Sequence, residues 1–124
     1  MKAAIIILSD PKSGADEARS RMLNGLAMAD ECLRAGDQLE ILFAGSGTRW
    51  PAELNRLDDP GNPIFTRLRG NVVGASRSCA ARNEALDGLK EASIPLLSDN
   101  AVEGTPGVAS IRRYHEEGWT VTQF

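Results

Sequence analysis

Residues 3–8, Ala-Ala-Ile-Ile-Ile-Leu, form an unbroken apolar run near the start of the chain. The run is too short for an amphipathic helix, and its apolar residues do not alternate with polar ones as they do in a strand with one solvated face. Such runs are typical of strands that are buried on both faces of a parallel sheet. We therefore expect a central strand here, with other structure packed on both of its sides.

The segment that follows has the pattern of a helix. Apolar residues recur at helical spacing from Ala18 to Leu33, and Gly36 is placed to end the helix in a left-handed conformation. Ser13 and Asp16 have the spacing of a capping box, in which each side chain serves the backbone of the other. We expect the helix to begin directly after Ser13.

Strand and helix patterns then alternate to the end of the chain. We expect further strands at 39–44, 71–76, 94–98 and 119–124. We expect short helices at 51–57 and 64–68 and longer helices at 78–89 and 105–118. Thr105-Pro106 caps the last of these helices. Alternation of this kind implies right-handed crossovers between parallel strands. The predicted fold class is α/β, with an open, mostly parallel five-stranded sheet and helices on both faces.

Length and composition predict a single domain over residues 1–124. The chain has 42% hydrophobic residues, enough for a packed core, and a net charge of −3, which is unfavourable for a nucleic-acid partner. No apolar stretch approaches the about 18 residues of a membrane span, and no signal-peptide pattern is present, so we expect a cytoplasmic protein with reduced thiols. Two cysteines and one histidine form no zinc pattern, so we expect no metal and no cofactor.

The strand ends indicate where ligand chemistry is expected. In open parallel sheets, ligands bind beyond the carboxyl ends of the strands. This rule selects residues 9–10, 45–48, 76–79 and 98–100. Gly45-Ser46-Gly47 lacks the spacing of a phosphate-binding loop, so a nucleotide or flavin site has no support beyond analogy of fold.

Cys79 is the residue of this edge best suited to catalysis. It is expected in the first turn of a helix, where unpaired N–H groups and the helix dipole favour a thiolate. Arg77 and Arg82 flank it and act in the same direction, and a thiolate is the form that attacks or carries sulfur. The alternative is that Cys79 only packs beneath the loop. Cys32 lies on the apolar side of the first helix, as a core residue does.

Six further residues are expected to shape a ligand site at this edge. They are Asp10, Ser76, Arg77, Ser78, Arg82 and Asn100. Each also has an ordinary structural reading, because Asp, Asn and Ser are common in turns and caps that follow strands.

Three segments carry a resemblance to a known family. Gly74-Ala75-Ser76-Arg77-Ser78-Cys79-Ala80, Ile94-Pro95-Leu96-Leu97 and the ending Gly118-Trp119-Thr120-Val121-Thr122-Gln123-Phe124 resemble the DsrE/DsrF-like family of small sulfur-relay proteins. The resemblance spans essentially the whole chain. It implies a flavodoxin-like, three-layer α/β fold, assembly into trimers or hexamers, and in some members a cysteine persulfide that passes between donor and acceptor proteins. Relatives often have two cysteines in the first segment, whereas this chain has Ser76 and Cys79, and a serine cannot hold a persulfide.

Two functions remain open at this point, and the sequence does not decide whether the protein is an enzyme. In the first, Cys79 carries sulfur as a persulfide, with Arg77 and Arg82 stabilising the thiolate and with Asp10 and Asn100 shaping the pocket. In the second, the protein is a non-catalytic oligomeric module that binds a small ligand or a partner protein.

Overall fold

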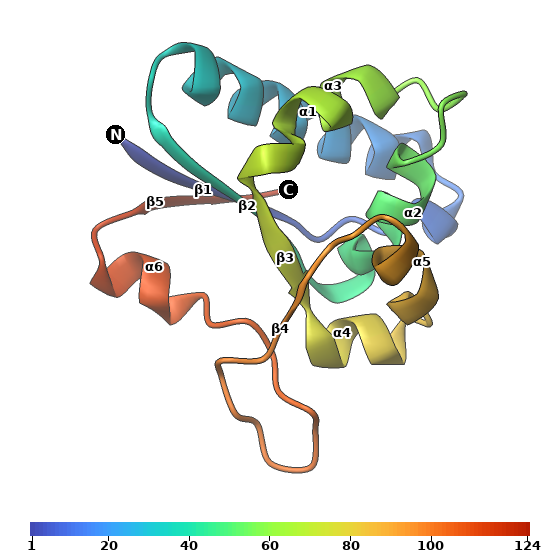
Figure 1. Ribbon diagram of the computed structural model, residues 1–124, viewed down its shortest axis with the longest axis vertical. Coiled ribbons are helices and arrows are strands. Elements are labelled where there is room, and N and C mark those ends of the chain that lie inside the picture. Colours follow the sequence, from blue (N-terminus) through green and yellow to red (C-terminus); the bar gives the residue numbers. More distant parts are fainter.

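The computed structural model describes residues 1–124 and contains one sheet of five strands (Figure 1). The strands are β1 (Lys2–Ile7), β2 (Gln38–Phe43), β3 (Val72–Ser76), β4 (Leu96–Leu97) and β5 (Thr120–Gln123). Their order in the sheet is β4-β3-β2-β1-β5, and every neighbouring pair is parallel. The predicted fold class, an open α/β sheet of five strands, is confirmed.

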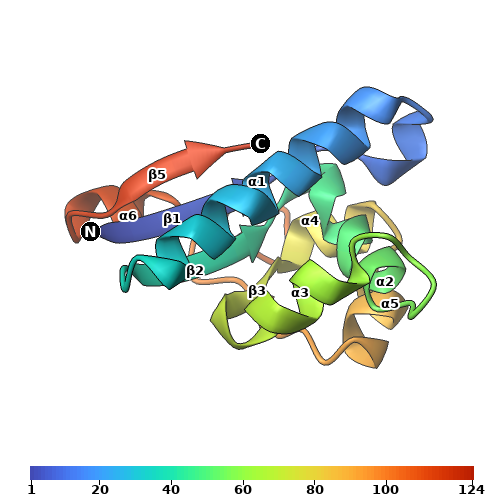
Figure 2. The same ribbon diagram turned by 90° about the horizontal axis from the view of Figure 1, so that it is seen from above.

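The helices lie in two unequal layers. They are α1 (Asp16–Arg34), α2 (Trp50–Leu54), α3 (Asn62–Leu68), α4 (Arg77–Arg82), α5 (Leu86–Glu91) and α6 (Arg112–Glu116), with short 3-10 turns at Pro11–Ser13, Gly45–Arg49 and Arg69–Asn71. From β1 to β4 the chain moves across the sheet in one direction, and right-handed crossovers then place the connecting helices on one face. Figure 2 shows α1 along β1 and β2, with α2 and α3 beside it. The chain then crosses to β5 on the other side of β1, and α6 covers the opposite face.

The larger layer holds most of the core. Its 21 buried residues include Ile5, Ile7 and Phe43 from the sheet and Met22 and Leu26 from α1. Burying a side chain of this size contributes about 1.5–3 kcal/mol, so this layer supplies most of the apolar stabilisation. None of the six helices combines the length and the apolar sequence that a membrane span requires.

The smaller layer explains the unbroken apolar run at the start of the chain. Ala4, Ile6 and Leu42 point to the opposite face and pack with Ala109 and Tyr114 in a cluster of six buried residues. Consecutive residues of β1 are therefore buried on both faces of the sheet, as the absence of alternation predicted.

The capping box predicted for the first helix is wrong. Ala15 is the N-cap of α1, and no side chain caps this end. Ser13 belongs instead to a separate 3-10 turn, which Asp10 caps by accepting a hydrogen bond from the Lys12 amide at 2.9 Å. Gly14 follows with a φ of 74° and ends that turn before α1 begins. Local turn chemistry therefore takes Ser13 away from the helix.

The helix expected over residues 78–89 is two helices. α4 ends at Arg82 and α5 begins at Leu86, and Glu84 between them has a φ of 54°. A positive φ is incompatible with a continuous right-handed helix. The break turns the chain after a helix of only six residues, so the dipole at Cys79 is that of a short helix.

The helix expected from Thr105 is also wrong over most of its length, because only Arg112–Glu116 is helical. Residues 98–109, which we call the arm, extend away from the body as a loop in which Asn100 pairs antiparallel with Val108 (Figure 1). The Thr105 hydroxyl accepts from the Gly107 amide at 3.1 Å, and Gly104 and Gly107 both have positive φ. These features form turns, which Thr-Pro in the sequence does not distinguish from a helix start.

Candidate functional site

The switch point of the sheet lies between β1 and β5, because the strand order reverses there. Ligands commonly bind at such a point, but here Phe124 occupies it. Its carbonyl oxygen accepts hydrogen bonds from the Leu8 amide at 2.6 Å and the Ser9 amide at 3.3 Å. Its ring lies close to Gly25 of α1, where an added Cβ would come within 3.0 Å of the ring. The open space at the carboxyl edge lies instead beyond β2 and β3.

A cavity of about 410 Å³ opens there between the loop after β2, the helix α4 and the arm. We call it the Cys79 cavity. Its lining residues are Gly45, Ser46, Ser78, Cys79, Arg82, Asn83, Thr105 and Val108. The lining thus contains one thiol and one cation, and it contains no carboxylate.

Helix α4 places the reactive groups of this cavity together. Cys79 and Arg82 are three positions apart, so they share one side of the helix. Cys79 is half-buried, whereas the Arg82 side chain is exposed and makes no ion pair or hydrogen bond to another residue. The Ser78 amide donates to the Gly107 oxygen at 2.9 Å, and the Ser78 hydroxyl has no partner within the protein. The cavity therefore has a free guanidinium and a free hydroxyl beside its thiol.

Asn83 fixes the position of α4 against the loop after β2. Its Nδ2 donates to the Cys79 oxygen at 2.8 Å and to the Gly45 oxygen at 3.3 Å. Its Oδ1 accepts from the Ser46 hydroxyl at 3.1 Å, and its backbone oxygen accepts from Arg49 Nε at 3.0 Å. Sequence reasoning missed Asn83, because the helix was expected to continue past it and its partners lie 37 and 38 positions earlier in the chain.

Asp10 belongs to the same edge but anchors the loop after β1 instead of lining the Cys79 cavity. Arg49 Nη1 lies 3.0 Å from both carboxylate oxygens of Asp10. Partial burial acts to raise the pKa of Asp10, but the Lys12 amide and Arg49 outweigh it and hold that pKa below its ordinary value. Asp10 is therefore ionised and paired at neutral pH.

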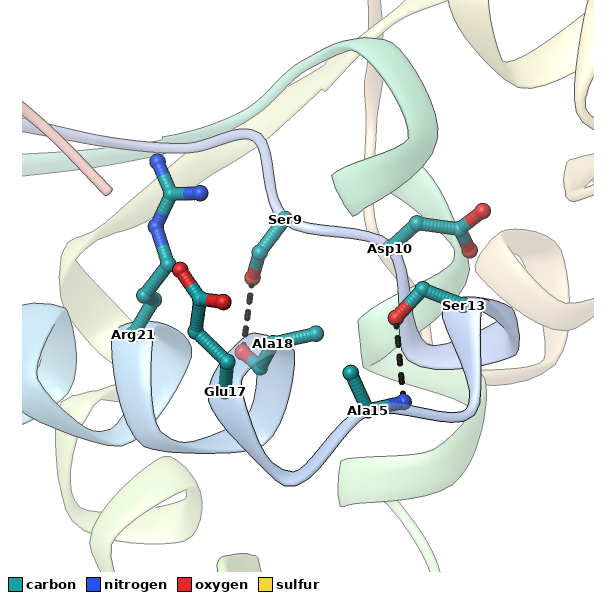
Figure 3. Close-up of a pocket in the computed structure, with 7 residues that line it drawn as sticks. All are labelled: Ser9, Asp10, Ser13, Ala15, Glu17, Ala18 and Arg21. Carbon is teal, nitrogen blue, oxygen red and sulfur yellow. Dashed lines mark hydrogen bonds between the residues drawn. The ribbon is translucent and has the colours of Figure 1, made fainter.

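A smaller cavity of about 240 Å³ lies beside Asp10, at the start of α1 (Figure 3). Ser9 donates its hydroxyl proton to the Ala18 oxygen at 2.9 Å, and the Ser13 hydroxyl accepts from the Ala15 amide at 3.4 Å. In Figure 3 the Asp10 carboxylate points away from the other charged groups, Glu17 and Arg21. This cavity presents opposite charges and no thiol, so it is the weaker candidate for a site.

The structure separates the residues that the sequence singled out. Ser78, Cys79 and Arg82 line one cavity. Ser76 is 2% exposed, and its hydroxyl accepts from the Ala109 amide at 3.1 Å, so it ties the arm to the end of β3. Arg77 is exposed and lines a different groove of about 370 Å³ together with Leu86, Asp87, Lys90, Ile94 and Leu96. Asn100 is exposed in the arm, where its backbone pairs with that of Val108.

Cys32 is in a different environment from Cys79. It is 5% exposed in the core beneath α1, and both cysteines are free thiols. Burial raises the pKa of the Cys32 thiol, and the nearby Asp37 raises it further. A buried thiol that resists ionisation is a poor nucleophile. No group of three or more His, Cys, Asp and Glu side chains comes together as a set of metal ligands.

Comparison of the chain with protein families, with curated proteins and with solved structures finds no match. The fold and the cavity by themselves define the class of protein: an open, parallel α/β protein with a thiol-bearing cavity at the carboxyl edge of its sheet.

Proposed function

We propose that the protein carries sulfur as a persulfide on Cys79 in intracellular sulfur transfer. The observation that carries the proposal is the half-buried Cys79 thiol in a cavity of about 410 Å³ whose only charged lining residue is Arg82. Cys32, the other thiol, is buried in the core and is no competitor for this role. The resemblance of residues 74–80 to the DsrE/DsrF-like family supports the same chemistry, in which sulfur passes from a donor to an acceptor protein.

The proposed step is a sulfur transfer without net oxidation. The Cys79 thiolate attacks the outer sulfur of a donor persulfide, and a bond forms between Sγ and that sulfur. The sulfur–sulfur bond of the donor breaks, and the donor leaves as a thiolate. The attacking Cys79 thiolate and the departing donor thiolate each carry one negative charge. The positive charge of Arg82 at the cavity therefore stabilises reactant, transition state and product alike.

Intact-mass measurement tests the proposal. After incubation with a low-molecular-mass persulfide, the protein should gain the mass of one sulfur atom, and a thiol reductant should remove it. Cys79→Ser should abolish the gain, whereas Cys32→Ala should leave it unchanged because Cys32 is buried. Sulfur loading that persists undiminished in Cys79→Ser would end the proposal.

A second candidate, the non-catalytic oligomeric binding module, is favoured by the smaller layer of the fold. Around α6 and the arm, that face leaves six apolar side chains only half-buried; they are Leu8, Val73, Leu97, Ile111, Trp119 and Val121. Contact with another copy of the chain would cover them. We expect a trimer or hexamer in light scattering, and a monomer at micromolar concentration would contradict this assembly. If assembly alone is the function, Cys79→Ser should leave both assembly and partner binding unchanged.

A further inference from the structure

The size of the Cys79 cavity limits what it can admit. Its volume of about 410 Å³ falls in the range of small-molecule sites, about 300–1,000 Å³. Three segments of the chain border it and leave one side open to solvent: the loop after β2, the helix α4 and the arm, which contributes Thr105 and Val108. A molecule of a few to about twenty non-hydrogen atoms fits such a space.

The charge of the lining limits the ligand further. Three arginines, Arg21, Arg77 and Arg82, make no ion pair or hydrogen bond to another residue. Of these, only Arg82 lines the Cys79 cavity. Glu84, two residues further along the chain, lines a different cavity with Lys12 and Arg49 and makes no ion pair with Arg82, and Asp10 is already paired with Arg49. The positive charge of Arg82 therefore lacks a counterion inside the protein.

The hydroxyls of the cavity are not equivalent. Ser46 donates to Asn83 Oδ1 at 3.1 Å, and Thr105 donates to the Val102 oxygen at 2.7 Å. The hydroxyl of Ser78, one residue before Cys79, has no partner within the protein. A ligand in the cavity thus meets a free hydroxyl donor and a free guanidinium on the helix that carries the thiol. A carboxylate matches this pair, because a guanidinium binds both of its oxygens at once.

We propose that the sulfur donor at this cavity is a small, carboxylate-bearing persulfide, held by Arg82 and Ser78 while its outer sulfur meets Cys79. This inference rests on the proposed function and specifies its substrate class. In the reaction, the thiolate of Cys79 takes the outer sulfur, and the donor departs as a small thiolate that still bears its carboxylate. No further oxidant or reductant takes part.

The arm favours a small donor over a protein-borne one. Residues 98–106 are exposed, and Figure 1 shows the arm extending past α4, beyond the body of the protein. The base of the arm is held beside Cys79 by the bonds from Ser78 N to the Gly107 oxygen and from Ala109 N to Ser76 Oγ. The arm therefore forms one wall of the cavity and projects beyond it, an obstacle that a small donor avoids more easily than a broad protein surface does.

Alkylation of Cys79 in a Cys32→Ala background tests the charge preference without any sulfur donor. Iodoacetate and iodoacetamide differ by one negative charge and little in size. The rate constant for iodoacetate divided by that for iodoacetamide should be about threefold to fivefold lower in Arg82→Gln than in wild type, a modest change because Arg82 is exposed. At high salt, the ratio of wild type should approach that of Arg82→Gln. Arg21→Gln, which removes an equally unpaired charge on α1, should leave the ratio unchanged. An equal ratio in wild type and Arg82→Gln overturns the inference.

Sulfur loading from matched donors separates this inference from the function on which it rests. The probes are the persulfides of 3-mercaptopropionate and of its amide, which differ only in the carboxylate. We expect wild type to load about threefold to fivefold faster from the carboxylate than from the amide, and Arg82→Gln to lose that preference. Equal rates with both donors overturn the substrate class but leave the persulfide function standing. Loading from a persulfidated protein but from neither small donor overturns the small-donor inference alone, and no loading from any donor overturns both.

Discussion

Asn83 donates a hydrogen bond from its Nδ2 to the backbone oxygen of Cys79 at 2.8 Å. The same amide group also holds the loop after β2, and the backbone oxygen of Asn83 accepts from Arg49, which is paired with Asp10. A continuous set of contacts thus joins the end of β1 to the helix that carries the thiol. Residues predicted as separate members of the site are linked through a residue that the sequence did not single out.

Asn83→Ala should loosen this arrangement at Cys79. The variant loses three side-chain hydrogen bonds at a half-buried position, so the free energy of unfolding should fall by about 1–3 kcal/mol in urea denaturation. Alkylation of Cys79 by iodoacetamide should become faster, because the end of α4 is no longer held against the loop. Asn62→Ala is the control, because it removes a 2.9 Å bond to the Leu54 oxygen far from the cavity. It should lower stability without changing the alkylation rate, and an unchanged rate in Asn83→Ala would show that Asn83 does not position Cys79.

Gly47→Ala should be among the most damaging single changes at the carboxyl edge. Gly47 is buried in the turn after β2, and an added Cβ would overlap the backbone oxygen of Ile7 and lie 2.7 Å from its carbonyl carbon. Backbone cannot move aside as a side chain can, so we expect a loss of about 3 kcal/mol or more, measured by urea denaturation. Gly70→Ala is the matched control. It has no atom within 4 Å of the added Cβ and no positive φ, so its stability should stay within about 0.5 kcal/mol of wild type.

Ser76→Ala should free the base of the arm. The Ala109 amide, which is buried, would lose its acceptor at 3.1 Å, at a cost of about 1–3 kcal/mol. Limited proteolysis should then cut within residues 98–109 faster than in wild type, and the Ala109 amide should exchange its hydrogen faster. Ser98→Ala removes an exposed hydroxyl without a partner in the protein and should change neither rate. Equal protection of Ala109 in Ser76→Ala and wild type would contradict the role assigned to this hydroxyl.

The sequence predicted the fold because its strongest signals are local. Residues 3–7 lie on a strand that is buried on both faces, and Ala18, Met22 and Leu26 share the buried face of α1. Such patterns depend on the residues of one element and on their period alone. The same holds for Cys79 and Arg82, which are brought together by the spacing of a helix.

The parts that were not predicted depend on contacts between distant segments or on turn geometry. The first part of the helix expected from Thr105 belongs to the arm, which is held by the bond within the Thr105–Gly107 turn, by the Ser78 amide and by the acceptor oxygen of Ser76. Ser76 looked like a ligand residue at a strand end, but the return of the arm covers it. Sequence position at the edge of a sheet therefore indicates where a site lies, whereas the packing of later segments decides which side chains reach it.

The buried Tyr114 should make the stability of the protein sensitive to alkaline pH. Burial, with a smaller contribution from the nearby Glu40 carboxylate, raises the pKa of Tyr114 well above its ordinary value. An unfolded chain releases this proton near pH 10, whereas the folded protein retains it, so stability should fall as the pH rises above about 10. Tyr114 is the one tyrosine of the chain, so absorbance at 295 nm should report its ionisation directly, near pH 10 in urea and only at higher pH in the folded protein.

Tyr114→Phe is the control, because it removes a buried hydroxyl without a hydrogen-bond partner. Its stability at neutral pH should change by less than about 1 kcal/mol, and it should lose less stability than wild type as the pH rises above about 10. Tyrosinate that forms near pH 10 in the folded protein would show that the layer under α6 is open to solvent.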